Sequence, residues 1–429
     1  MGDPGQPSSL VLTPFQLPSD VADSYSVSPV EPPTSALPVR TREGAAALEV
    51  LHVTEALGHG GAEQNLLTFL RHLPPERFRH HLAWMYDDDR LLDQFRPHVA
   101  SLIPLRCGRK LGMLPGVARL ARWIRLNQPD VVHTQLTRAM VLARSASGAS
   151  RVPVVSSWQS AAYEERALAD YGNSRWRRNL VRMLDRQSGR FDRHFIAVSQ
   201  HVAQHYASQV GVGADRISVV YNAVDPYRYA PVAVEELAKT RSELGLDGIS
   251  PVLLTVGRLV PGKAQVESVR ALAGVRAKFP NARLLIAGSG PLHDELAAEA
   301  RHLGLEGAVH LLGSRSDMPA LYQICDLFVF PTHYEGLSVA LLEALSNGMP
   351  AAVSGIPQNR EIAEHLPSVK FFEVRDVQDQ VAATLSVLSR LTAARTEAAA
   401  ATEDLRRRFD PTLLAAQFGS VLENAAAAL

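Results

Sequence analysis

The chain is poor in the features that mark a membrane-spanning protein, a disulfide scaffold or a nucleic-acid binder. It has two cysteines, Cys107 and Cys325, in 429 residues. That number gives neither a disulfide framework nor a metal-ligand cluster. No apolar run approaches the roughly 18 residues of a membrane span. Lys+Arg and Asp+Glu are equal at 44 each, whereas nucleic-acid binders normally have a basic excess. We expect a cytoplasmic protein, free or held peripherally at the inner face of the membrane, with no nucleic-acid partner.

Residues 1 to 45 differ in composition from the rest of the chain. They hold 8 of the 27 prolines, together with many serines and aspartates, and they show no hydrophobic periodicity. This composition is typical of a disordered Pro/Ser-rich leader. The opening MGDPGQPSSL has neither a positively charged segment nor an apolar core, so we expect no signal peptide.

From residue 46 onward, strand and helix patterns alternate. LEVLHVTE is strand-like, GHGG at residues 58 to 61 interrupts it, and AEQNLLTFLRHL has helical periodicity. Such a glycine loop can receive a phosphate at the helix N-terminus, although a tight turn also needs glycine. Further alternation predicts a doubly wound α/β domain. His133 and Gln159 then fall at the carboxyl ends of strands, where such folds bind ligands. The main alternative for His133 is a structural histidine with satisfied hydrogen bonds.

Two charged stretches in this half each have two interpretations. Asp87, Asp88 and Asp89 follow a strand pattern and could hold the metal of a metal-dependent sugar transferase, but a solvated turn is favoured because Asp is a common turn residue. Residues 175 to 193 form a basic, partly aromatic patch, RWRRNLVRMLDRQSGRFDR. The patch is compatible with peripheral membrane contact or an acidic acceptor, while the intervening Asp185 and Asp192 favour a solvated helix face.

A second alternation follows a proline-containing linker and carries two cations on one loop. The strand pattern PVLLTV leads to Gly257 and Arg258, the loop continues through Lys263, and a helix follows. Arginine can bind a diphosphate bidentately and lysine can act as a point charge, so this loop suits a diphosphate. The alternative is a solvated loop with incidental basic residues.

The next glycine loop, Gly288-Ser289-Gly290-Pro291, superficially matches a dinucleotide-binding fingerprint. His293 stands where that fingerprint has its third glycine, and the loop is far from the first strand of the chain. A hydride-transfer role is therefore disfavoured.

The stretch HYEGLSVALLEALSNGMP, residues 333 to 350, combines two carboxylates with a helix N-terminus. It follows the apolar strand pattern DLFVFP, and the residues from Ser338 suit a helix. Glu335 and Glu343 would lie broadly on one side if the helix began at once. Gly336 permits a close backbone approach to a ligand, and the amides of residues 337 to 339 would point towards an anion. An amphipathic helix with two solvated acids is the alternative.

The order of these landmarks resembles that of the retaining glycosyltransferases of family 4, also called glycosyl transferases group 1. The matching pieces are GGAE, VGRLVPGK, IAGSGP and HYEGLSVALLEALSNGMP, and the resemblance covers residues 48 to about 428. It implies an α/β protein with the GT-B architecture, in which two Rossmann-like doubly wound domains face each other across a cleft. The expected divisions are a leader (1–45), an N-terminal acceptor-side domain (46–225), a C-terminal nucleotide-sugar-binding domain (226–408), and a C-terminal helix returning to the N-terminal domain (409–429).

The resemblance also implies a site for a nucleotide-diphosphate sugar. Arg258 and Lys263 match the pair that neutralises the diphosphate, Glu335 matches the carboxylate facing the sugar, and Glu343 matches the ribose ligand. The remaining implied donor-binding positions are backbone groups or glycines: Gly60, Gly61, Gly288, Gly290, Leu337, Ser338 and Val339. The family needs no metal or other cofactor and retains anomeric configuration, so Glu335, Lys263 and Arg258 are expected to act without a protein nucleophile.

The sequence departs from the family pattern at two positions. Gln159 stands where many relatives have a histidine near the reacting sugar, and glutamine cannot titrate. Ala223 replaces a usual glycine in the linker.

We expect a hexosyltransferase acting on a hydroxyl acceptor, a glycan or lipid-linked glycan. The rivals are a nucleotide-sugar 2-epimerase of the same fold and a non-catalytic scaffold that binds a protein partner.

Overall fold

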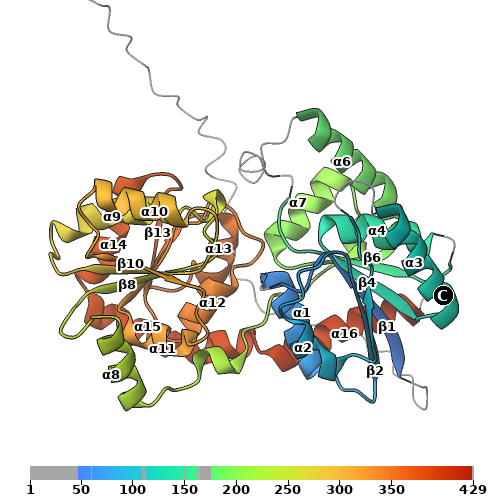
Figure 1. Ribbon diagram of the computed structural model, residues 1–429, viewed down its shortest axis with the longest axis horizontal. Coiled ribbons are helices and arrows are strands. Elements are labelled where there is room, and N and C mark those ends of the chain that lie inside the picture. The colour runs from blue at the N-terminus through green and yellow to red at the C-terminus, as the bar shows by residue number, and fades with distance from the viewer. Residues whose placement is uncertain are drawn as a thin grey trace, which may run out of the picture. The chain divides into compact units, whose positions relative to one another are not determined.

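The structure is a computed structural model that describes residues 47–58, 60–108, 113–148, 150–162, 164 and 175–427. The leader expected for residues 1 to 45 lies outside the described residues. Figure 1 shows that the described chain builds two open α/β sheets, each with helices packed against it. The prediction of two doubly wound sheets is confirmed, while the exact domain boundaries stay a prediction.

The first sheet has seven parallel strands among the described residues, in the order β3-β2-β1-β4-β5-β6-β7. The strands are β1 (Leu48–Thr54), β2 (Phe78–Trp84), β3 (Ser101–Pro104), β4 (Val131–Gln135), β5 (Val154–Trp158), β6 (Asp192–Ala197) and β7 (Ile217–Val219). The helices of this half are α1 (Gly61–His72), α2 (Leu92–Phe95), α3 (Met113–Asn127), α4 (Thr137–Ser147), α6 (Arg175–Ser188) and α7 (Gln200–Val210).

The second sheet has six parallel strands among the described residues, in the order β10-β9-β8-β11-β12-β13. The strands are β8 (Val252–Val256), β9 (Arg283–Ala287), β10 (Val309–Gly313), β11 (Leu327–Phe330), β12 (Ala351–Ser354) and β13 (Val369–Phe372). The helices are α8 (Val234–Glu243), α9 (Gln265–Arg276), α10 (His293–His302), α11 (Met318–Ile324), α12 (Val339–Ser346), α13 (Pro357–Ala363), α14 (Val377–Leu388) and α15 (Leu391–Arg408).

Both faces of the first sheet are covered, which explains why its strands are near-continuous apolar runs rather than alternating ones. On β1, Val50 belongs to the apolar cluster that includes Phe69 of α1, whereas Leu51 belongs to the cluster that includes Leu120 of α3. Neighbouring residues of a strand point to opposite faces. The sheet is thus the middle layer between two sets of helices.

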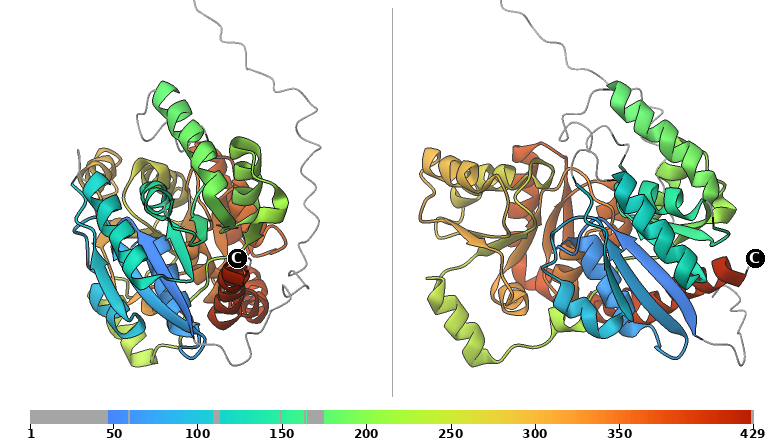
Figure 2. Two further views of the ribbon diagram at one scale, coloured as in Figure 1. Left: turned by 90° about the vertical axis from the view of Figure 1, so that its right-hand side faces the viewer. Right: turned by 45° about the vertical axis from the view of Figure 1, so that its right-hand side comes forward.

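The C-terminal helix α16 (Pro411–Ala427) returns to the first sheet, as expected. The rings of Phe418 and Phe69 stack with centroids 5.1 Å apart, and Arg77 donates two hydrogen bonds to Glu423 at 2.7 and 2.8 Å. Figure 2 shows α16 lying beside the strands of the first sheet. A helix from the C-terminal end of the chain, α16, therefore covers part of the first sheet.

Hydrogen bonds join the two halves at the loop that follows β11 and at α13. The Ser199 hydroxyl donates to the carbonyl of Gly336 (2.9 Å), and the Asn222 amide donates to the carbonyl of Leu337 (3.1 Å). The backbone N–H of Gln200, at the start of α7, donates to the Glu361 carboxylate (2.7 Å). The loop after β11 is thus held by groups from the first half of the chain.

Candidate functional site

The strand order places the candidate site at the carboxyl end of the second sheet. Starting from the centre of the sheet, β8, β9 and β10 follow one another towards one edge, and β11, β12 and β13 follow one another towards the other edge. The strand order therefore reverses between β8 and β11. In open parallel sheets, ligands bind outside the carboxyl ends of the strands at such a reversal. The loops that follow these two strands carry Arg258, Lys263 and Glu335, and Glu343 lies in α12, the helix after the second loop.

Lys263 and Glu335 form an ion pair that joins these two loops. The Lys263 ammonium donates to Oε1 of Glu335, and the two side chains are 23% and 10% exposed. The ammonium also lies 5.9 Å from the centroid of the Phe330 ring. Ala264, the next residue, has a φ of 52°, which is uncommon for a residue with a side chain and marks local strain. The structure thus brings together two residues that lie 72 positions apart.

Arg258 lies exposed on a loop whose backbone packs against the Gly288–Gly290 loop. A Cβ at Gly288 would lie 1.9 Å from the carbonyl oxygen of Gly257, and one at Gly290 would lie 2.4 Å from that of Leu259. No side chain fits at these distances, so the two glycines allow the two loops to touch. The structure therefore gives both glycines a packing role, and direct contact of either with a donor stays a prediction.

Glu343 is a buried carboxylate held at both oxygens. The Tyr322 hydroxyl donates to Oε2 (2.7 Å), and Nε of Arg228 lies 3.3 Å from Oε1. Burial raises the pKa of Glu343 above its ordinary value, whereas Arg228 and the Tyr322 hydrogen bond act in the opposite direction. Glu343 is thus no solvated acid, and its orientation is fixed by two neighbours that our sequence analysis did not identify.

The segment between Glu335 and Glu343 passes from loop into helix close to the expected position. Helix α12 begins at Val339, and Ser338 is its N-cap, accepting a hydrogen bond from the backbone N–H of Leu341 (3.3 Å). A Cβ at Gly336 would lie 2.0 Å from the carbonyl oxygen of Gln159, so this glycine permits a close approach to the first half of the chain. The predicted loop position of Glu335 and the predicted helix start near Ser338 are thus confirmed.

The amides of residues 337 to 339 lie ahead of the first regular hydrogen bond of α12. That bond runs from the backbone N–H of Leu342 to the carbonyl of Ser338 (3.1 Å). Helix N-termini leave their leading N–H groups without partners inside the helix, and these groups suit an anion. Their contact with a phosphate stays a prediction.

The first turn of α1, directly after the glycine loop, contains a second buried carboxylate, Glu63. A Cβ at Gly60 would lie 2.1 Å from Oε2 of Glu63, whereas a Cβ at Gly61 would meet nothing within 4 Å. Burial raises the pKa of Glu63 to about 7, and the positive charge of Arg258 opposes that rise. Glu63 was overlooked as a site residue, although it is the last letter of the GGAE motif.

His133 belongs to a row of buried histidines that crosses three strands. Nδ1 of His133 and Nδ1 of His52 are 3.0 Å apart, and Nε2 of His52 is 3.0 Å from Nδ1 of His80. Burial lowers the pKa of His133 to about 3 and that of His80 to about 4. These histidines are therefore neutral near pH 7, and the structural interpretation of His133 gains support.

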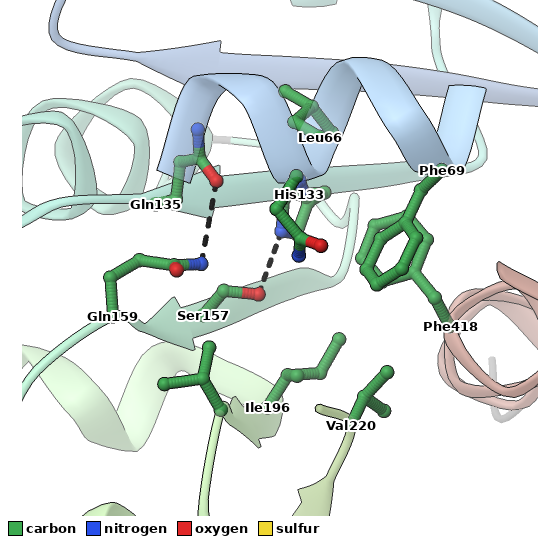
Figure 3. Close-up of a pocket in the computed structure, with 11 residues that line it drawn as sticks. Leu66, Phe69, His133, Gln135, Ser157, Gln159, Ile196, Val220 and Phe418 are labelled. Atoms are coloured by element: carbon green, nitrogen blue, oxygen red, sulfur yellow. Dashed lines mark hydrogen bonds between the residues drawn. The ribbon is translucent and has the colours of Figure 1, made fainter. Parts of the chain in front are cut away.

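His133 and Gln159 also line one small pocket, drawn in Figure 3. Nε2 of His133 lies 2.8 Å from the Ser157 hydroxyl oxygen, and the Gln159 amide is 3.5 Å from Oε1 of Gln135. Polar groups from the carboxyl ends of β4 and β5 thus face a wall that includes Phe418 of α16. The structure brings these two candidate residues together, and their contact with a sugar or acceptor stays a prediction.

The acidic triplet shows no metal-site geometry. The Asp88 carboxylate accepts two hydrogen bonds from Arg90, both 2.8 Å long. Across the part of the chain that the structure describes, no group of three or more His, Cys, Asp or Glu side chains could hold a metal ion. The expectation that no cofactor is required stays a prediction.

Two family models match the chain on either side of the linker. The model described as Glycosyltransferase Family 4 matches residues 59–228, and the model described as Glycosyl transferases group 1 matches residues 238–402. Together they span strands β2 to β13 and the candidate residues named above.

Curated relatives match over different shares of their length. The UDP-Gal:alpha-D-GlcNAc-diphosphoundecaprenol alpha-1,3-galactosyltransferase of Escherichia coli is 26% identical over 350 residues, which are 79% of this chain and 88% of the relative. An uncharacterised glycosyltransferase of Methanocaldococcus jannaschii is 31% identical over 173 residues. That match covers 40% of this chain and 44% of the relative, so the chain spans less than half of that protein.

Solved structures of similar shape match almost all of the described chain. Anabaena HepE in complex with UDP has a TM-score of 0.74 at 24% identity, covering 88% of this chain and all of HepE. WaaG, a glycosyltransferase involved in lipopolysaccharide biosynthesis, has a TM-score of 0.68 at 16% identity and covers 87% of this chain and 99% of WaaG. These likenesses show a common fold. No helix among the described residues is long and apolar enough to cross a membrane.

Proposed function

We propose that this chain, a GT-B glycosyltransferase of the family 4 and group 1 type, transfers a hexose from a nucleotide-diphosphate sugar to a hydroxyl acceptor with retention of anomeric configuration. The observation that carries the proposal is the Lys263–Glu335 pair at the strand-order reversal of the second sheet. It supplies a cation for a leaving diphosphate and a carboxylate next to the position that the sugar would take.

The charges at this reversal fit the departure of a nucleoside diphosphate. In the reaction the bond from the anomeric carbon to the phosphate oxygen breaks, and negative charge develops on the diphosphate. Lys263 and Arg258 supply positive charge, and the amides ahead of α12 supply aligned N–H groups. Groups aimed in advance at developing charge stabilise a transition state without reorganising. This arrangement supports a reaction that needs no metal ion.

The acceptor oxygen forms the new bond on the same face of the sugar, and its proton passes to the departing phosphate. No protein nucleophile is assigned. Glu335 would orient the sugar by accepting hydrogen bonds from its hydroxyl groups. Glu343 would accept hydrogen bonds from the ribose, because Arg228 and Tyr322 use only part of the four lone-pair positions of a carboxylate.

Similar proteins indicate which substrates to test first. HepE has been solved with UDP and with UDP-glucose. The name of the Escherichia coli relative gives UDP-galactose as donor and a sugar-diphosphoundecaprenol as acceptor. We therefore propose a UDP-hexose donor and a glycan or lipid-linked glycan acceptor.

The test is a donor screen with the full-length protein. UDP-, GDP- and ADP-hexoses are titrated by calorimetry with and without EDTA, and the anomeric linkage of the product is read by NMR. We expect saturable binding of a UDP-hexose that EDTA does not abolish, and a retained linkage. An isomerised sugar nucleotide formed without acceptor would favour the 2-epimerase, and a lack of binding by every donor would favour the non-catalytic scaffold.

A further inference from the structure

A hollow lined by arginines lies at the amino-terminal ends of the strands of the first sheet. It is bounded by the end of α4 and by the starts of β5 and β6, and Ala425 of α16 also lines it. Arg151, Arg190 and Arg193 are exposed on its walls, and Phe191 between them is 68% exposed. We call these four residues the arginine hollow. The strands are parallel, so the hollow lies at the opposite end of the strands from Gln135 and Gln159.

The acids next to the arginine hollow are turned inward. Nη1 of Arg144 lies 2.5 Å from Oδ1 of Asp185, and Nη2 lies 2.5 Å from Oδ2 of Asp192. The Asp185 and Asp192 side chains are 7% and 0% exposed, and that of Arg144 is 1% exposed. The sequence argument for a solvated helix face depended on these two aspartates. Because both aspartates are buried and form ion pairs with Arg144, neither presents its charge on the surface of the 175–193 stretch.

The arginines of the hollow have no protein carboxylate to pair with among the described residues. Arg151, Arg190 and Arg193 form no salt bridge there. Their exposed charges therefore suit phosphate groups from outside the chain, which arginine binds bidentately. An exposed phenylalanine between them adds an apolar group, and Phe is among the residues that interfacial membrane-binding segments bury at the headgroup boundary.

A bilayer fits this surface better than a nucleic acid. Nucleic-acid binders normally have a basic excess clustered on one face, whereas the hollow offers three arginines on a chain with no net charge. A fluid membrane supplies headgroups singly and an apolar layer for the ring. Basic residues near an anionic leaflet each add to binding.

We propose that the arginine hollow is a membrane-docking surface, in which Arg151, Arg190 and Arg193 bind the phosphates of anionic lipids and Phe191 enters the interfacial layer. The inference does not depend on the donor chemistry, because binding to vesicles requires no nucleotide sugar. Failure of one proposal therefore leaves the other open to its own test.

The experiment is co-sedimentation of the full-length protein with phosphatidylcholine vesicles that contain no, or 30%, phosphatidylglycerol. We expect binding only to the anionic vesicles, and we expect high salt to weaken it because salt screens exposed charges. Arg190→Gln combined with Arg193→Gln should lower the partition coefficient about 30-fold, which corresponds to about 1 kcal/mol per basic residue. Phe191→Ser should weaken binding without changing its salt dependence.

The matched control removes two positive charges elsewhere, by Lys278→Gln combined with Arg301→Gln at exposed positions of the second half. Thermal unfolding verifies that each variant is folded. The proposal is overturned if the full chain binds neutral and anionic vesicles equally, or binds neither. It is also overturned if the control pair loses as much binding as the hollow pair, or if a DNA duplex binds the hollow while vesicles do not.

Discussion

The Tyr322 hydroxyl donates a 2.7 Å hydrogen bond to Glu343, joining α11 to α12 through two buried side chains. Arg228 binds the other oxygen of the same carboxylate from the linker that precedes α8. A hydrogen-bonding group in a candidate ligand site is useful only if its direction is fixed. Here the fixing residues come from two other segments of the chain, so the position of Glu343 depends on the tertiary fold.

Replacing Glu343 with Gln should raise the KM for the donor about 10- to 100-fold and change kcat little, because hydrogen bonds to charged groups contribute about 1.5–3 kcal/mol. Initial rates over a range of donor concentrations measure this. Tyr322→Phe keeps the carboxylate and removes one support, so its KM should rise less than that of Glu343→Gln. An unchanged KM in Glu343→Gln would remove Glu343 from the donor site.

Lys263→Met should act mainly on kcat. If the ammonium stabilises charge on the leaving diphosphate, its loss should lower kcat about 100- to 1000-fold, as removal of one preorganised donor does elsewhere. Single-turnover rates at saturating donor measure the chemical step. Lys278→Met, at an exposed position after α9, is the control. A Lys263→Met enzyme with a normal rate and a raised KM would show that Lys263 binds substrate and transition state equally.

The strands were predictable from the sequence because a parallel sheet covered on both faces requires continuous apolar runs. DLFVFP and LEVLHVTE are such runs, and each contains a strand of the structure. The loops that carry Lys263 and Glu335 could be placed for the same reason, since each directly follows an apolar run. The short strands β3, β12 and β13 have weaker patterns and were not identified.

Partners that lie far apart in the chain could not be predicted. Arg144 lies 41 residues before Asp185, and no periodicity links the two. A single sequence shows that both aspartates exist but not which way they point, so the charge of the 175–193 surface was misjudged. Tyr322 and Arg228 were missed for the same reason. Glu63 had a local signal, because it stands three residues after Gly60 in the glycine loop.

Arg144→Met should destabilise the fold by at least about 3 kcal/mol, because removing one partner of a buried ion pair leaves uncompensated charge inside the protein. Two carboxylates, those of Asp185 and Asp192, would lose their cation. Urea unfolding at pH 7 measures the change. The exposed Arg186→Met on α6 is the control. If both variants unfold at the same urea concentration, the buried pairing makes no net contribution to stability.

Glu63 predicts a specific pH dependence of stability. Its pKa is raised by burial from 4.5 to about 7, so between these values the folded protein binds more protons than the unfolded chain. Stability from this group is therefore lost as pH rises from about 4.5 to 7, by up to about 3 kcal/mol. Glu63→Gln cannot titrate, so the stability of the wild type relative to this variant should fall over that range.

The measurement for Glu63 is urea unfolding of both proteins at several pH values from 4.5 to 8. Comparing wild type with variant cancels the titration of the buried histidines, which acts in the opposite direction. Glu76→Gln, at an exposed position between α1 and β2, controls for the substitution itself. A stability difference between wild type and Glu63→Gln that is constant with pH would contradict the burial of an ionisable Glu63.

Gly336→Ala tests the contact between the two halves of the chain. The added Cβ would lie 2.0 Å from the carbonyl oxygen of Gln159, which is a backbone atom and cannot rotate away. The Gly336 carbonyl would then also move from the Ser199 hydroxyl, 2.9 Å distant. We expect kcat to fall at least about 10-fold, because small displacements in an active site cost this much or more. Donor binding to the second half should change less.

Gly307→Ala is the matched control, because a Cβ at that position meets nothing within 4 Å. Calorimetry with the donor and steady-state rates with the acceptor separate binding from turnover in both variants. If Gly336→Ala turns over at the wild-type rate, the close approach to Gln159 is not needed for catalysis. If it loses donor binding and turnover together, the loop acts through the position of Glu335 and the helix N-terminus rather than through the contact between the halves.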